Sequence, residues 1–306
     1  MNGVIPPPVY LRKSGENIQS EITSTGGEKT RGCALLLGGF DGLHKGHERL
    51  LAAAKQSGLP VAAICISGGK GAPLFTETER NAVFFNHGIF AVYPFIYDKI
   101  KNVPARDFAL AVKEKIAPAR CFCGEDFRFG AGGKANGSDF RTYSGVPVQT
   151  IPVLKDETTG EKIGAEGIKA LLAAGDIKAA DALLSGGFFL TGVVIKDRGV
   201  GRTIGFPTAN IRYPEGKFVI RRGVYETAAT IAGKEYKGIT NFGARPTFFN
   251  DAVMTETHFL NFSGDLYGKT LTLYFKRFLR EISAFKSAEE LTKQLDFDKR
   301  RVINGD

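Results

Sequence analysis

Hydrophobic and polar positions alternate in two different ways along the 306-residue chain. From about residue 33 to residue 154, short apolar runs alternate with stretches of helical spacing, which predicts strands and helices in turn. The strand-like runs are CALLLGGF, PVAAICIS, AVYPFIY, ARCFCGE and VPVQTIPVL. Because strand–helix alternation is typical of a parallel sheet with helices on both faces, we predict a doubly wound α/β architecture here.

The predicted helices carry start signals. Thr76 and Glu79 match a capping box, in which the two side chains satisfy backbone N–H groups of the first turn. Pro104 stands where a proline is tolerated, near a first turn. The helical stretches predicted in this half are 44–58, 76–88, 104–117, 166–175 and 176–186.

The pattern changes after Gly186. Strand-like runs follow one another closely, separated by glycine-containing turns, which predicts an all-β barrel or sandwich. A final helix is expected over 287–302, with Ser287 as N-cap and Glu290 in its first turn. We therefore expect an α/β domain over 1–185 and an all-β domain over 186–306.

Composition is that of a soluble globular protein, with 43% hydrophobic and 24% charged residues. No apolar run reaches the ~20 residues that a membrane helix needs, and the first residues lack the apolar stretch of a signal peptide. We expect a cytoplasmic protein with no membrane partner. The four cysteines are expected to be buried free thiols, because a C-x-C pair is a poor zinc signal.

The net charge of +9 is compatible with nucleic acid, anionic lipid or small phosphorylated ligands. Basic residues are spread along the chain, and the densest groups are only RR at 221–222 and KRR at 299–301. No nucleic-acid-binding motif accompanies them. Scattered positive charge therefore favours a small phosphate-rich ligand, and a nucleic-acid role rests on net charge alone.

The segment GGFDGLHKGHERLL joins the first predicted strand to its helix. Ligands of doubly wound sheets bind at the carboxyl ends of strands, where helix N-termini offer free N–H groups to phosphate. His44 and His47 lie on one helical face and can both hydrogen-bond a phosphate. The alternative is a helix cap and a packing residue. Close backbone approach is allowed by Gly38, Gly39, Gly42 and Gly46.

GGFDGLHKGH resembles the H-x-G-H motif of the nucleotidyltransferase superfamily. Together with LFTETER and CGEDFRFG, it is similar to the adenylyltransferase half of the bifunctional riboflavin kinase/FAD synthetase family. The resemblance implies a Rossmann-like domain that binds ATP and FMN. It assigns ATP binding to Gly38, Phe40, Asp41, His44, Gly46 and His47, and a flavin–nucleotide site to Asp126, Phe127, Arg128 and Gly130.

One motif of this half departs from the family pattern I-S-S-T-x-I-R, because the matching stretch reads IGAEGIK. Gly164 and Ala165 cannot supply the hydroxyls that hydrogen-bond triphosphate oxygens. Glu166 brings a like charge, which repels an anion by about 4 kcal/mol at ~4 Å and an effective dielectric of ~20. Lys169 lacks the bidentate fork of arginine. We predict weakened or absent FMN adenylylation; the alternative is that the loop re-forms and Lys169 suffices.

A second constellation, TGVVIKDRGVGRTIGFPTANI, begins the all-β half. Its glycine-rich loop carries positive charge and can fold over phosphates, although it lacks the lysine pattern of a P-loop. Thr208 and Asn210 are two apart, so an extended chain directs both to one side. Their oxygens suit Mg²⁺ or its phosphates. The expected phosphate-binding residues of the loop are Gly199, Gly201, Arg202 and Gly205.

This block, followed by RRGVYET, GITNFGARPTF, TETHFLNFSGDLYGK and FLREISAFKSAEELTKQLDFD, resembles riboflavin kinase. The resemblance implies a six-stranded barrel with a terminal helix, Glu256 as general base on the ribityl 5′-hydroxyl, and Arg280 near the flavin. Strand alternation puts Glu256 and His258 on one face and the flanking threonines on the other. We expect an inward Glu256, and a His258 that packs or hydrogen-bonds beneath the site.

The leading interpretation is therefore an enzyme that uses ATP and Mg²⁺ to phosphorylate riboflavin to FMN, with a weakened FAD synthetase domain. A fully bifunctional riboflavin kinase/FAD synthetase is the second interpretation. The third is a flavin- or nucleotide-sensing protein whose first domain binds ligand without chemistry. The expected partners are riboflavin, FMN and ATP.

Overall fold

The computed structural model describes residues 9–10, 21–22, 31–69, 71–196, 206–244 and 253–305. Its contacts divide the chain into two compact units, Met1–Gly167 and Ile168–Asp306. Most of helix α6 (Ala165–Ala174) and all of α7 (Ile177–Leu183) fall in the second unit. The sequence pattern assigns both helices to the first domain, so a boundary near residue 185 remains a prediction.

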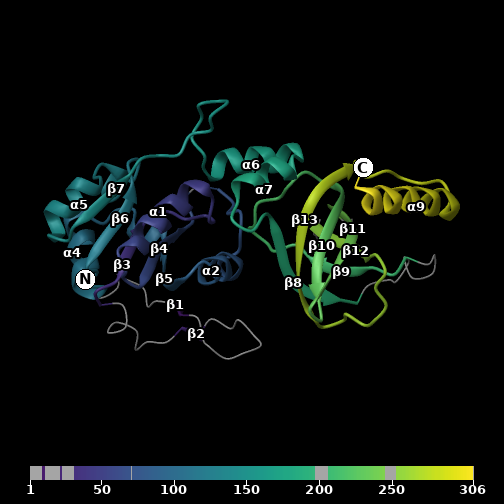
Figure 1. The fold of residues 1–306 in the computed structure, drawn as a ribbon, viewed down its shortest axis with the longest axis horizontal. Coiled ribbons are helices and arrows are strands. Elements are labelled where there is room, and N and C mark those ends of the chain that lie inside the picture. Colours follow the sequence, from purple (N-terminus) through teal and green to yellow (C-terminus); the bar gives the residue numbers. More distant parts are fainter. Residues whose placement is uncertain are drawn as a thin grey trace. The chain divides into compact units, whose positions relative to one another are not determined.

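The first unit is built on a seven-stranded sheet in the order β2-β1-β5-β4-β3-β6-β7 (Figure 1). The five strands from β5 to β7 are parallel, and the short β1 and β2 are antiparallel at one edge. The predicted α/β architecture is therefore confirmed. The strands are β1 (Val9–Tyr10), β2 (Glu21–Ile22), β3 (Ala34–Leu37), β4 (Val61–Ser67), β5 (Ile89–Ile96), β6 (Arg120–Gly124) and β7 (Val148–Ile151).

Helices cover both faces of this sheet. Right-handed crossovers place α1 and α2 on one face and α4 and α5 on the other. Thr76 and Glu79 form the predicted capping box of α2, and Pro104 directly precedes α4. The sequence analysis missed α5, a short helix that Asn136 caps. The helices are α1 (Lys45–Gln56), α2 (Glu77–Asn86), α3 (Tyr97–Ile100), α4 (Ala105–Lys115) and α5 (Gly137–Ser144), with a 3-10 turn at Ala131–Gly133.

One hydrophobic cluster of the first unit lies between the sheet and α4 and α5. Leu35, Leu37 and Ile64 pack there against Phe108 and Phe140. Burying each such side chain contributes about 1.5–3 kcal/mol to folding. All four cysteines are buried and free, as predicted. No group of three or more His, Cys, Asp or Glu side chains among the described residues could hold a metal.

The second unit is a closed antiparallel barrel in the order β10-β11-β12-β9-β8-β13, which confirms the predicted six-stranded barrel (Figure 1). Large aromatic residues fill its interior, where Tyr225, Phe242 and Phe275 are fully buried and meet edge to face. The strands are β8 (Phe189–Ile195), β9 (Ala209–Arg212), β10 (Gly223–Ile231), β11 (Lys234–Ala244), β12 (Val253–Phe259) and β13 (Thr270–Arg280).

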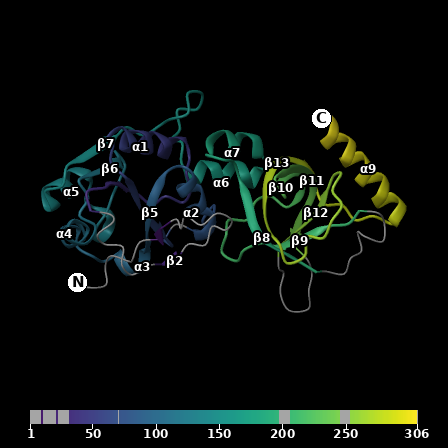
Figure 2. The ribbon, with the colours of Figure 1, turned by 60° about the horizontal axis from the view of Figure 1, so that its bottom comes forward.

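Helix α9 (Ala288–Asn304) lies along the outside of the barrel (Figure 2). Ser287 caps it as predicted, accepting a hydrogen bond from the Glu290 backbone N–H. Val302 is fully buried in a cluster with Val224 and other barrel residues, which anchors the helix to the barrel wall. Among the described residues, no helix combines the length and apolar composition that crossing a bilayer requires.

Candidate functional site

The two histidines of the H-x-G-H motif lie where β3 passes into α1. His44 is the N-cap of α1, and its Nδ1 accepts a hydrogen bond from the His47 backbone N–H at 3.3 Å. The Nδ1–H of His47 donates to the Gly42 carbonyl at 2.7 Å, and the two rings stack 3.6 Å apart. These bonds select opposite tautomers: His44 presents Nε2–H as a donor, and His47 presents Nε2 as an acceptor. His44 is therefore a helix cap, which was the alternative to phosphate binding in the sequence analysis. Capping uses only Nδ1, so Nε2 of His44 is available to a ligand.

Both histidine rings are neutral at neutral pH. Burial, with Lys162 as a second cause, lowers the pKa of His44 to about 4. The pKa of His47 falls well below its ordinary value of 6.5, first because of burial and then because of His44. A bound phosphate would favour the charged form of either ring and raise its pKa. The site therefore offers neutral hydrogen-bonding groups that can take up a proton as negative charge arrives.

Phe40 and Asp41 build the turn that precedes the histidines. Phe40 adopts a positive φ of 38°, uncommon for a residue with a side chain, and its ring lies 4.5 Å from that of His47. Asp41 Oδ1 accepts a hydrogen bond from the Leu74 N–H at 2.8 Å, which ties LFTETER to the histidine turn. A Cβ at Gly38 would lie 2.9 Å from the Phe40 ring, so this turn requires glycine.

The divergent IGAEGIK stretch lies beside the same turn. The Ile163 carbonyl oxygen would be 3.4 Å from a Cβ built at Gly46. Glu166 is exposed in the first turn of α6, and Lys162 forms an ion pair with Asp126 of the CGEDFRFG motif. The stretch therefore occupies the position expected of a triphosphate-binding segment, but without hydroxyl groups.

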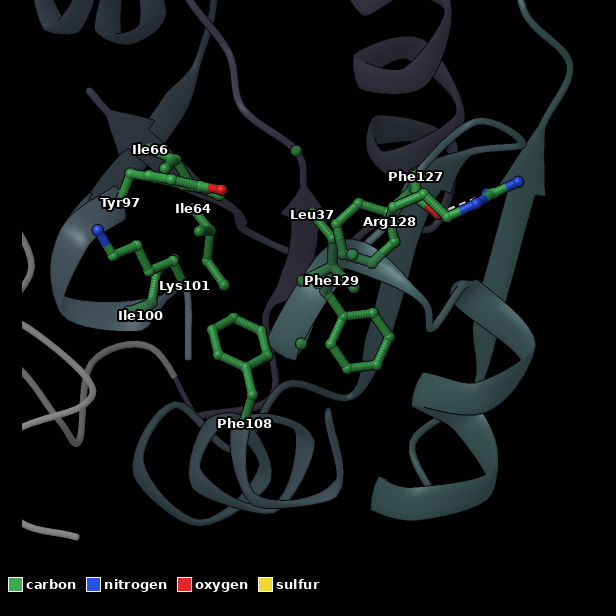
Figure 3. A pocket seen from close by; sticks show the side chains of 14 residues that line it. Leu37, Ile64, Ile66, Tyr97, Ile100, Lys101, Phe108, Phe127, Arg128 and Phe129 are labelled. Atoms are coloured by element: carbon green, nitrogen blue, oxygen red, sulfur yellow. Dashed lines mark hydrogen bonds between the residues drawn. The ribbon is translucent and has the colours of Figure 1, made fainter. Parts of the chain in front are cut away.

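A pocket of about 110 Å³ opens at the carboxyl ends of β3 and β4. Phe108, Phe129 and Ile64 point into it, and Phe127 stacks on Phe129 with ring centroids 5.5 Å apart (Figure 3). Its lining is predominantly apolar, which suits a planar ring system. The lining residues are Leu37, Gly38, Ile64, Ile66, Tyr97, Ile100, Lys101, Phe108, Phe127, Arg128, Phe129, Gly130, Gly132 and Gly133.

Three of the predicted flavin–nucleotide residues, Phe127, Arg128 and Gly130, line this pocket. The guanidinium of Arg128 turns away and donates to the carbonyls of Phe127 (2.8 Å) and Glu125 (3.1 Å) (Figure 3). Asp126 is not among the lining residues. The sequence analysis missed Tyr97, Phe108, Ile64 and Ile66, because they belong to elements that carry no motif.

In the barrel, strand pairing collects the predicted kinase residues. Glu256 on β12 lies directly opposite Asn210 on β9 and Asn241 on β11. Directly opposed residues share a face, with Cβ atoms about 4.5–5.5 Å apart. Continuing across β10, Val224 opposes Asn241, and Arg280 on β13 opposes Val224. One row therefore runs over five strands, and Asn241 is a member that the sequence analysis did not single out.

The expectation that Glu256 faces inward is wrong. Thr255 and Thr257, which alternate with it, are 0% and 1% exposed and occupy the barrel interior, whereas Glu256 is half-buried on the outer side. The interior is narrow and filled with side chains, so it leaves no room for a charged group. The hydroxyl of Thr257 joins the chain Thr227–Thr240–Thr257, with oxygens 2.7 and 2.8 Å apart.

In the barrel, the side chain of Asn210 indicates a ligand-binding position most clearly. This side chain is 4% exposed, and its Oδ1 is buried with no hydrogen-bond partner in the part of the chain that the structure describes. An unsatisfied buried acceptor costs about 1–3 kcal/mol. Half-buried Thr208 lies two residues earlier. An amide oxygen beside a hydroxyl fits the hard oxygen ligands that Mg²⁺ prefers. The four predicted loop residues, Gly199, Gly201, Arg202 and Gly205, lie outside the described residues.

His258 supports the FPTAN segment, as predicted. Its Nδ1–H donates to the Pro207 carbonyl at 3.0 Å, and its ring meets that of Phe206 edge to face with centroids 5.0 Å apart. Burial is the main cause that lowers the pKa of His258. A neutral ring with its proton on Nδ1 makes this contact, so His258 positions the chain that leads to Thr208.

Arg280 contacts the terminal helix. Its guanidinium forms a bidentate pair with Asp298 of α9, with Nη2–Oδ2 at 2.8 Å and Nε–Oδ1 at 3.2 Å. Asp298 is fully buried and also accepts a hydrogen bond from Gln294 at 2.9 Å. Arg280 thus fastens α9 to the end of the residue row. Flavin contact by Arg280 stays a prediction.

These two units define a protein class: a nucleotidyltransferase-type α/β unit followed by a kinase-type barrel. A family model of FAD synthetase matches residues 27–165, and one of riboflavin kinase matches residues 184–304. The chain belongs to the family of bifunctional riboflavin kinase/FMN adenylyltransferases. As a riboflavin kinase, the enzyme transfers a phosphoryl group from ATP to riboflavin and forms FMN.

The similarity to known relatives spans both units. The bifunctional riboflavin kinase/FMN adenylyltransferase of Mycoplasma pneumoniae is 33% identical over 88% of this chain and 95% of its own length. That of Pseudomonas fluorescens is 29% identical over 88% and 91%. The trifunctional protein RibF/MnmA of Mycoplasmoides gallisepticum is 30% identical over 90% of this chain, which spans only 40% of that longer protein.

The fold is also that of a solved structure. The crystal structure of a macrolide-efflux protein from Streptococcus pneumoniae has a TM-score of 0.79 and 25% identity, and it covers 89% of this chain and 94% of its own. The combination of an α/β unit with a barrel unit is therefore known in one chain.

Proposed function

We propose that the barrel phosphorylates riboflavin with Glu256 as general base and with Thr208 and Asn210 as ligands of Mg²⁺. We further propose that the N-terminal domain binds ATP and FMN but adenylylates FMN slowly. The observation that carries the kinase proposal is the direct opposition of Glu256 and Asn210 across neighbouring strands. It puts a proton acceptor beside a buried oxygen that lacks a partner.

In the kinase step, Glu256 accepts the proton of the ribityl 5′-hydroxyl as that oxygen attacks the γ-phosphorus of ATP. The bond between this phosphorus and the β,γ-bridging oxygen breaks, and ADP leaves with that oxygen. The buried Oδ1 of Asn210 and the hydroxyl of Thr208 would hold the magnesium ion. When bound, the ion neutralises negative charge on the phosphates. Phosphoryl transfer depends mainly on positioning. The pairing of the two neighbouring strands therefore contributes to catalysis by holding these groups in register.

In the N-terminal domain, the apolar pocket accepts the flavin ring, and His44 and His47 hydrogen-bond phosphate oxygens. Slow adenylylation follows from the IGAEGIK stretch beside the histidine turn. It offers no hydroxyl to the triphosphate, and exposed Glu166 adds a like charge to its first helical turn. We infer a cytoplasmic setting, which the four buried free thiols support.

Product analysis with the whole chain tests both proposals. Purified protein is supplied with riboflavin, ATP and Mg²⁺, and products are separated over time; a parallel reaction starts from FMN and ATP. FMN is expected to accumulate, with FAD forming far more slowly in both reactions. FAD formation as fast as FMN formation would overturn the slow-adenylylation proposal. Absence of FMN under these conditions would overturn the kinase site.

The retained pocket favours one second candidate, a flavin-sensing N-terminal domain without chemistry. It predicts that FMN binds to the whole chain together with ATP while no pyrophosphate is released. Slow but steady pyrophosphate release, equal to the FAD formed, would exclude this alternative.

A further inference from the structure

Arg80 on α2 is a buried cation with no counter-ion among the described residues. Its side chain is 4% exposed, and its Nη1 donates a long hydrogen bond of 3.4 Å to the Ser67 hydroxyl. The Nε and Nη2 atoms are buried with no hydrogen-bond partner, and no carboxylate of a described residue forms an ion pair with Arg80. Burying an unpaired charge is costly, so this arrangement indicates that an anion completes it.

The position of Arg80 is at the carboxyl edge of the sheet. Ser67 is the last residue of β4, and the neighbouring Ile66 donates its N–H to the Gly39 carbonyl at 3.2 Å. Phe84, one turn after Arg80 on the same helical face, meets Phe40 edge to face with centroids 5.9 Å apart. The guanidinium therefore lies near the turn that leads into the histidine motif.

We propose that Arg80 binds the terminal phosphate of the flavin mononucleotide in the N-terminal domain; this rests on the proposed FMN binding by that domain. The unpartnered Nε–H and Nη2–H groups lie on one edge of the guanidinium, the edge that binds two oxygens of a phosphate at once. This fork matches the oxygens of a carboxylate or a phosphate, and the phosphate monoester is the anionic group that FMN would bring to it.

The strand order explains why this phosphate belongs to the flavin and not to ATP. His44 and His47 follow the central strand β3, and the Lys162–Asp126 pair is on the β6 side of it. Arg80 is on the opposite side, at the end of β4. In β4, Ile64 and Ile66 face the apolar pocket, so Cys65 and Ser67 face the other way. Arg80 therefore lies across the carboxyl end of β4 from the pocket, and the proposal requires the ribityl chain of a flavin in the pocket to pass this strand end to bring its phosphate to Arg80.

The decisive experiment uses full-length Arg80→Met and Arg80→Lys, with Arg106→Met, an exposed arginine of α4, as the matched control. Initial rates of FAD formation are measured at varied FMN and at varied ATP. Arg80→Met is expected to raise the KM for FMN at least tenfold while the KM for ATP changes less than twofold. Arg80→Lys should have an intermediate effect. The riboflavin kinase rate of every variant should match that of the parent, and an unchanged KM for ATP in FAD formation verifies that the first unit is folded.

The proposal would be overturned if Arg80→Met had the same KM for FMN as the parent, because Arg80 would then be a purely structural cation. A melting temperature of Arg80→Met above that of the parent would strengthen this conclusion. Should Arg80→Met fail to fold, Arg80→Lys decides by the same KM comparison. Failure of adenylylation itself is distinguished by calorimetric titration of FMN and of riboflavin. If the variant loses one FMN site while its riboflavin binding is unchanged, the proposal that Arg80 binds the FMN phosphate is supported, even when the parent forms no FAD. Identical FMN titrations of parent and variant overturn that proposal.

Discussion

The two sites of this chain are built in different ways. In the barrel, Asn210, Glu256 and Asn241 are brought together by strand register, so every residue of the row is held by a ladder of backbone hydrogen bonds. At the sheet edge, the groups come from turns after β3, β4 and β6 and from the start of α6. A ladder resists local change, whereas a turn can lose a hydroxyl without unfolding. This difference is consistent with a chain in which the IGAEGIK motif of the first unit departs from the family pattern while the strand register of the barrel row is intact.

The strongest test of the comparison is Glu256→Gln. Removing the proton acceptor should lower the riboflavin phosphorylation rate by about 10³-fold, within the range for general bases, and leave FAD formation from added FMN unchanged. Steady-state assays of both reactions measure this. Glu235→Gln, an exposed residue of β11, is the matched control. A Glu256→Gln enzyme with normal kinase turnover would assign the base to another residue.

A second test concerns the pH dependence of stability in the first unit. The pKa of His44 is lowered to about 4 when folded, against 6.5 when unfolded. Between these values the unfolded chain binds a proton that the folded chain does not, so stability falls as the pH drops from 6.5 to 4. The loss amounts to about 3 kcal/mol at 1.36 kcal/mol per pKa unit.

His44→Asn keeps a helix-capping side chain and removes this titration. Chemical unfolding of the first unit, followed across pH 4–7.5, should show a shallower loss of stability in the variant and equal pH dependence above pH 7. A variant that loses stability on acidification as steeply as the parent would show that His44 is not the group responsible.

A third test restores the missing hydroxyls. Replacing Gly164, Ala165 and Glu166 by Ser, Ser and Thr should raise the rate of FAD formation about tenfold, since a hydrogen bond to a charged group contributes about 1.5–3 kcal/mol. The kinase rate should not change. The control replaces Glu166 alone by Gln, which removes the repulsion without adding a hydroxyl. If the triple replacement does not raise the rate of FAD formation, then either another part of the site limits adenylylation or adenylylation was never weakened.

The smallest expected effect tests the row across the barrel. Asn241→Ala should lower kcat for riboflavin phosphorylation about fivefold, because an amide opposite Glu256 can orient its carboxylate and one neutral hydrogen bond contributes about 1 kcal/mol. Asn241→Asp should cost more, since like charges opposed across strands repel. Equal kcat in parent, Ala and Asp variants would remove Asn241 from the site.

Prediction from sequence succeeded where a local rule applied. The capping residues Thr76 and Ser287 start their helices as expected, and the change of pattern after Gly186 marks the change from α/β to all-β structure. The prediction failed where the answer depended on distant pairing. Alternation separated Glu256 from its neighbouring threonines correctly, but only barrel closure decided which face was the interior.

By itself, the sequence determined the fold class of each half, most helices and strands of the first half, and the motifs behind the family resemblance, because these depend on spacing along a few residues. Tertiary structure alone decided that Asn241 stands beside Glu256, that Phe108 and Tyr97 complete a pocket, and that Arg80 is buried with no counter-ion among the residues described. These relations join residues far apart in the chain, and only packing and strand register bring them into contact.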